Sequence, residues 1–136
     1  MTIRTYTELL RHHTFEDRYE YLKLPGEVGR STFGYDRHLN QRFYKSAEWR
    51  QLRGYILVRD EGCDLADPDH PIAARPIIHH MNPLLPDDIV HSSDNLMNPE
   101  YLITVSHNTH NAIHYGDASL LPTPLVDRSP GDTKLW

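Results

Sequence analysis

Two adjacent histidines, His79 and His80, end the short apolar stretch IIHH. Successive side chains of a β-strand point to opposite faces, so the two imidazoles would serve different environments or different roles. Further along the chain, His110 and His114 are four residues apart and would lie on one face of a helix. Neutral imidazole is a common ligand of divalent metal ions. A third histidine from the strand would complete a three-histidine site that leaves coordination positions open for water and a phosphate oxygen.

The same residues exclude one familiar metal chemistry and indicate another. A zinc protease of the H-E-x-x-H type needs a glutamate base after the first histidine, but this position is Asn111, which cannot take up a proton. In a phosphodiesterase, the histidine of the pair that does not bind the ion would act as general base on water. The ion would hold the phosphate and stabilise charge on the leaving oxygen. His107, three residues before His110, lies near the same predicted helix face.

The elements that must position these histidines are short and well delimited. Strands are predicted over 76–80 and 101–105, where β-branched and apolar residues gather. Ser106 is a candidate N-cap for a helix that stops at Gly116. Together these elements form a ββα unit that brings both histidine pairs together.

The flanking chain predicts two more helices and two irregular segments. Thr14 and Ser46 are candidate N-caps, the first for a helix that ends before Pro25. Residues 81–100 read as a long loop, and residues 117–136 as an extended, proline-rich arm. The fold class is therefore α+β, with an N-terminal extension over 1–42, a core over 43–116 and the C-terminal arm.

Composition is that of an ordinary globular domain of 136 residues with a net charge of −5. The single cysteine, Cys63, excludes internal disulfides and fits a reducing, cytoplasmic setting. No apolar run is long enough to span a membrane, and no signal peptide is recognised. Residues 37–59 carry a net charge of +5 and residues 60–101 a net charge of −8. This pattern fits a cation-dependent enzyme acting on a phosphate polymer, or a helix with a solvated basic face.

The stretches FYKSAEWRQLRGYILVRDEGCDL, IIHHMNP and NPEYLITVSHNTHNAIHYG resemble the small HNH endonucleases of bacteriophages and prophages, which belong to the His-Me finger or ββα-metal superfamily. The resemblance covers residues 43–116. It implies that His79, His110 and His114 bind the metal ion and that His80 is the general base. It also implies phosphate contacts from the basic residues on and before the second helix, which are Arg42, Lys45, Arg50 and Arg53.

The sequence departs from the family's pattern at two places. Many relatives carry two C-x2-C knuckles for a structural zinc. Here the first pair keeps only Cys63, with Ala66 at the position of its partner, and Ser106 and Thr109 replace the second pair. We therefore expect no structural zinc, apolar packing in its place and a buried Cys63. The family's central asparagine is replaced by Tyr101. Its role would pass to the Tyr101 hydroxyl or to one of two loop residues, Asn95 and Asn98.

The resemblance implies a phosphodiester hydrolase that cleaves double-stranded DNA with one divalent ion, acting beside phage terminase and other packaging proteins. Three imidazoles favour Zn²⁺, Ni²⁺ or Mn²⁺, and Mg²⁺ would need oxygen ligands from substrate and water. The acidic loop residues Asp87, Asp88 and Asp94 would add a ligand or lie in solvent.

The first alternative to a nuclease is a non-catalytic accessory protein that keeps the scaffold to bind DNA or a phage protein. The second is a structural protein whose histidines only fill the fold. The DNA target and the oligomeric state are not indicated by the sequence.

Overall fold

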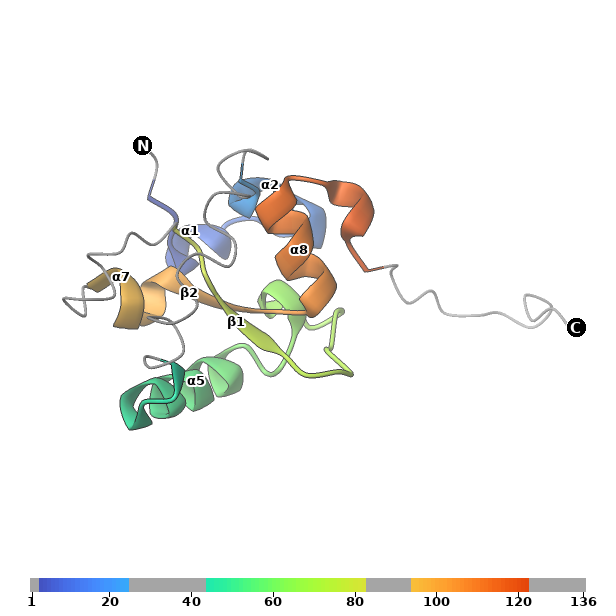
Figure 1. Cartoon of the computed structure of the whole chain (residues 1–136). Coiled ribbons are helices and arrows are strands. Elements are labelled where there is room, and N and C mark those ends of the chain that lie inside the picture. Colours follow the sequence, from blue (N-terminus) through green and yellow to red (C-terminus); the bar gives the residue numbers. More distant parts are fainter. Residues whose placement is uncertain (1–2, 25–43, 83–93, 123–136) are drawn as a thin grey trace, which may run out of the picture.

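A two-stranded antiparallel sheet lies between helices at the centre of the protein (Figure 1). The computed structural model describes residues 3–24, 44–82 and 94–122. Strand β1 (Ile77–His80) pairs with β2 (Leu102–Val105), and α8 (His107–Tyr115) and α5 (Ala47–Arg59) pack on opposite sides of the pair. The α+β class is confirmed, and the helix after β2 gives the order strand, strand, helix that the sequence predicts.

The register of the sheet separates two environments. Ile77 pairs with Val105 and His79 with Ile103, and the apolar members of these pairs pack in the core that includes α8. Ile78 and Leu102 belong instead to the cluster formed with Trp49 and Ile56 of α5. Because both faces are covered, every residue of β2 is buried, which explains its continuous apolar run.

Hydrogen-bonding N-caps begin the main helices at the predicted residues. Thr14 caps α2 (Phe15–Leu22), Ser46 caps α5 and Ser106 caps α8, each by accepting a hydrogen bond from the backbone N–H three residues later. Gly116 ends α8 with φ of 63°, a left-handed conformation that suits glycine. These predicted helices are confirmed.

The described end of the segment between the strands, residues 94–101, contains more regular structure than its composition predicts. A short helix α7 (Asp94–Met97) and a 3₁₀ turn η2 (Pro99–Tyr101) occupy the end of the predicted loop. Strand β2 consequently begins at Leu102, one residue later than predicted, because Tyr101 completes the turn that Asn98 caps. Residues 83–93 lie outside the described part.

The N-terminal residues pack directly on the ββα unit. Helix α1 (Tyr6–Leu9) and α2 contribute Leu9, Phe15 and Tyr19 to one core cluster with Val105 and Ile113. The Tyr19 hydroxyl donates to the Ala112 carbonyl at 3.2 Å. The described residues of the predicted extension therefore help to cover the sheet face that carries His79.

Two short 3₁₀ turns complete the described chain. One, η1 (Asp64–Ala66), lies between α5 and β1, and the other, η3 (Ala118–Leu120), follows α8. The predicted arm is described only as far as residue 122, so most of it stays a prediction. Among the described residues, no helix has the length and apolar character needed to cross a membrane.

Candidate metal centre

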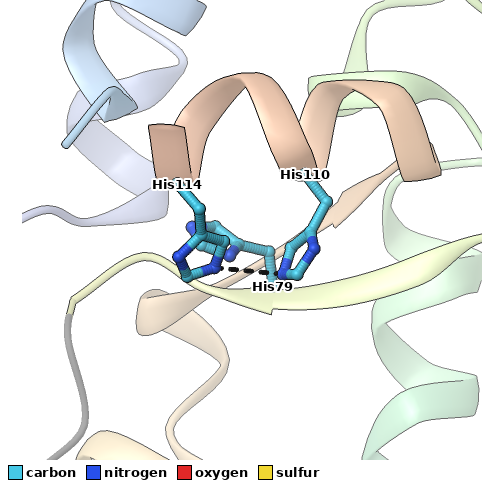
Figure 2. A group of neighbouring side chains, drawn as sticks. All are labelled: His79, His110 and His114. Carbon is cyan, nitrogen blue, oxygen red and sulfur yellow. Dashed lines mark hydrogen bonds between the residues drawn. The ribbon is translucent and has the colours of Figure 1, made fainter. Parts of the chain in front are cut away.

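Three histidines converge between β1 and α8 (Figure 2). His79 projects from β1 toward the helix, and its ring centroid lies 5.3 Å from that of His110 and 5.2 Å from that of His114. The two helix rings are 4.5 Å apart, because residues four apart share one face of α8. The structure therefore brings together the three residues that the sequence predicts as ligands.

The spacing of the ring nitrogens fits a single cation. Two imidazole nitrogens bound to one tetrahedral zinc ion lie roughly 3.3 Å apart, given metal–nitrogen bonds of about 2.0–2.1 Å. The Nε2 atoms of His110 and His114 are 3.1 Å apart, and one nitrogen from each of the three rings lies within 4.8 Å of the others. The three histidines are close enough to bind one metal ion after small ring movements.

Burial favours the neutral, metal-binding form of His79 and His110. His79 is 2% exposed, and burial, followed by the neighbouring His110 and His114, holds its pKa well below the usual value. Burial and His114 lower the pKa of His110 to about 3. Among the described residues, the Nε2 atom of His79 is buried without a hydrogen-bond partner. A buried ring nitrogen of this kind is costly unless a ligand satisfies it, and a bound cation would do so.

The adjacent histidine, His80, faces the other side of the sheet. Its ring stacks on Trp49 of α5, with centroids 5.5 Å apart and planes 15° from parallel. Its Nε2 lies 3.2 Å from the Leu96 carbonyl oxygen, which can only accept, so Nε2 carries the proton and donates it. In the neutral ring Nδ1 is then the basic nitrogen. The predicted division of the pair between two faces is confirmed, and its division into ligand and base stays a prediction.

The two segments where the resemblance would place zinc knuckles are joined by a buried carboxyl group. Asp64 is 2% exposed and accepts hydrogen bonds from the Ser106 backbone N–H at 3.0 Å and the Ser106 hydroxyl at 2.9 Å. The Thr109 hydroxyl donates to the same side chain. Burial raises the pKa of this carboxyl, and the hydrogen bonds oppose that rise. The apolar packing that the sequence predicts is present, since Leu65 and Ile113 share a core cluster, and the Asp64 carboxyl joins the same segments by hydrogen bonds.

Cys63 and Ala66 are small residues in or beside the apolar core. Cys63 is buried, as predicted, and its thiol lies 3.5 Å from the Glu61 carbonyl oxygen. Ala66 packs at the edge of the main core cluster. Burial raises the pKa of the Cys63 thiol, with the surrounding carboxylates acting in the same direction, so the residue stays protonated.

The three candidates for the role of the central asparagine have different positions. Tyr101 is half-buried directly before β2, and its carbonyl accepts from the Met81 N–H at 2.9 Å. The Asn98 side chain accepts from the Glu100 N–H at 2.9 Å and so caps η2. Asn95 lies in α7, and its side chain is outside the described part. All three assignments stay predictions.

The described phosphate-contact candidates lie before α5, in its first turn and near its middle. Lys45 and Arg50 are exposed, and the Arg50 guanidinium donates to the Lys45 carbonyl at 3.0 Å. Arg53 is half-buried and donates to the Pro76 carbonyl at 3.1 Å, next to the start of β1. Arg42 lies outside the described residues, as do Asp87 and Asp88.

Sequence reasoning missed the charged residues at the end of α5. Arg59 donates to the carbonyls of Pro99 at 2.7 Å and Leu102 at 2.6 Å, and Asp60 accepts from the Thr104 N–H at 2.9 Å. Nothing in their spacing indicates contact with β2 more than forty residues later.

Compared with known proteins, the chain matches no family model, no curated protein and no solved structure. The family resemblance therefore rests on the motifs alone.

Proposed function

We propose that the protein is a metal-dependent DNA endonuclease of the HNH type that hydrolyses phosphodiester bonds. The observation that carries the proposal is the convergence of His79, His110 and His114 on one small volume. His80, the neighbour of His79 in β1, lies on the opposite face of the sheet. A strand end and a helix face supply these groups, and both are held by packed elements.

The roles follow from the chemistry of each side chain. His79, His110 and His114 would hold the divalent ion, which when bound would polarise a phosphate oxygen and stabilise the leaving oxygen. His80 would take a proton from water through Nδ1, because its Nε2 already donates to Leu96. Stacking against Trp49 limits rotation of the His80 ring.

The substrate would approach across the beginning of α5. Lys45 and Arg50 present exposed cations there, and Trp49 from the same helix contacts His80. Contacts of this kind bind the DNA backbone and give register but no base recognition. Double-stranded DNA is thus the proposed substrate, and association with terminase or other packaging proteins in a host cytoplasm is proposed from the family resemblance.

Plasmid nicking tests this proposal. Supercoiled DNA is incubated with the protein and Mn²⁺, Mg²⁺, Ni²⁺ or Zn²⁺, and the rate of relaxation is measured. We expect metal-dependent nicking, a rate lower by about 10²–10⁴-fold in His80→Ala, and loss of activity in His110→Ala. His107→Ala is the matched control, because His107 is exposed on the same helix and outside the three-histidine cluster.

The same assay separates a second candidate function. Tyr101 in place of the central asparagine favours an accessory protein that binds DNA or a phage protein without cutting. That function predicts no metal-dependent nicking by the wild type, with metal binding intact. Equal nicking by the wild type and His80→Ala would contradict the assignment of the base.

A further inference from the structure

The segment between the two strands is tied at both ends to the N-terminal residues. Asn82 follows β1, and its side-chain oxygen accepts from the Arg4 N–H at 2.8 Å while its amide donates to the Arg4 carbonyl at 3.0 Å. Directly before β2, the Glu100 carboxylate accepts from the Thr7 N–H at 3.1 Å and from the Thr7 hydroxyl at 2.6 Å. Residues 4–7 therefore bridge the two ends of the segment.

Arg59, at the end of α5, also holds the residues directly before β2. Its guanidinium spans the carbonyls of Pro99 and Leu102 and lies 3.6 Å from the centroid of the Tyr6 ring. Asp60 fixes that guanidinium by accepting at 2.9 Å. Bidentate and charge-assisted bonds of this kind hold a peptide segment more tightly than single neutral ones.

The tied segment carries the carbonyl that orients His80. Leu96, whose carbonyl accepts from His80, is fully buried in α7. Asn98 connects α7 to η2 through hydrogen bonds from the backbone N–H groups of Glu100 and Tyr101 to its own side chain and carbonyl. Displacement of η2 would move the Leu96 carbonyl and change the direction of the His80 ring.

We propose that Asn82, Glu100 and Arg59 form a brace with residues 4–7 that positions His80 for proton transfer. The proposal rests on the nuclease function, because it gives these groups the task of orienting the base. They are positioning residues and act through the Leu96 carbonyl. The N-terminal residues would then be part of the catalytic unit and not an appendage to it.

A brace that only stabilised the fold would change different measurements. Loss of stability lowers the fraction of folded protein, which urea unfolding measures, whereas a misplaced base lowers kcat per folded molecule and leaves KM and metal affinity unchanged. The position of the His80 ring can also be read directly, because imidazole ¹⁵N shifts report which nitrogen carries the proton. This signal is independent of cleavage.

The test compares Asn82→Ala, Glu100→Ala and the double variant with the wild type in the full-length protein. We expect kcat for nicking to fall roughly tenfold or more in the double variant, with KM and Mn²⁺ affinity within about twofold. Glu100→Gln keeps one acceptor for Thr7 and should recover part of the loss. Glu20→Ala is the control, since it removes only a surface ion pair with Lys23.

The NMR measurement uses the same variants without substrate. The wild type should show His80 protonated at Nε2, and the double variant should show a mixture of both tautomers. Wild-type kcat in the double variant, or a lowered kcat with an unchanged His80 signal, would overturn the proposal. If the wild type does not nick DNA, the proposed function fails, and the His80 signal alone decides whether the brace orients the ring. If the double variant does not fold, the single variants Asn82→Ala and Glu100→Ala provide the same comparison.

Discussion

At the scale of single residues, the buried Asp64 joins two segments that lie more than forty residues apart in the sequence. Its carboxylate links the turn after α5 to the first turn of α8 through Ser106 and Thr109. Thr109 precedes His110, so this link also positions the helix face that carries His110 and His114. Hydrogen bonds from several donors offset the cost of burying this side chain. Removal of the carboxyl group would leave those buried donors without an acceptor, which lowers the stability of the fold.

Replacement of Asp64 by alanine should therefore destabilise the protein. We expect Asp64→Ala to lower the free energy of unfolding by about 3 kcal/mol, since it leaves buried donors of Ser106 and Thr109 without their acceptor. Urea denaturation followed by circular dichroism measures the change. Asp69→Ala, at an exposed position in the same acidic stretch, should change stability by less than about 0.5 kcal/mol. Equal effects of the two substitutions would contradict this account of Asp64.

At the scale of elements, one glycine lies within α5 and another in the turn that follows it. Gly54 lies in the exposed middle of the helix, and an added Cβ would meet nothing within 4 Å. Gly62, after the helix, has a φ of 66°, and its N–H donates to the Leu57 carbonyl at 3.0 Å. The two glycines therefore differ in backbone conformation and not in available space.

Alanine at these two positions should have opposite effects on stability. We expect Gly54→Ala to raise the free energy of unfolding by about 0.5–1 kcal/mol, because glycine is a poor helix former. Gly62→Ala should lower it by about 1 kcal/mol, because alanine is strained at positive φ. Thermal and urea unfolding give both values. A stabilising Gly62→Ala would show that the turn does not need its left-handed conformation.

The helices and strands were largely predictable from the sequence, and the long-range hydrogen bonds that hold them together were not. Caps at Thr14, Ser46 and Ser106 are local signals, so three helix starts could be located from neighbouring residues. Strand alternation and helix periodicity likewise predicted the faces of His79 and His110. Helix α7 was missed because its four residues lie among prolines, aspartates and asparagines, where turn signals dominate.

At the scale of the whole molecule, the sheet is covered by residues from both ends of the described chain. Leu9 and Phe15 share a core cluster with Ile113, and Asn82 pairs with Arg4 across 78 residues of sequence. Contacts of such separation leave no periodic trace, which is why the brace could not be predicted. The charge imbalance between residues 37–59 and 60–101 was visible in the sequence, but the inward roles of Arg59, Asp60 and Asp64 were not.

Metal stoichiometry tests the central claim most directly. The purified protein is dialysed against Zn²⁺ or Mn²⁺, and bound metal is measured by elemental analysis and calorimetry for the wild type, His79→Ala, His110→Ala and His107→Ala. We expect one ion per chain in the wild type and in His107→Ala, and affinity at least roughly tenfold weaker in His79→Ala and His110→Ala. No bound ion in the wild type, or equal binding in all four proteins, would contradict the convergence of these three histidines on one cation.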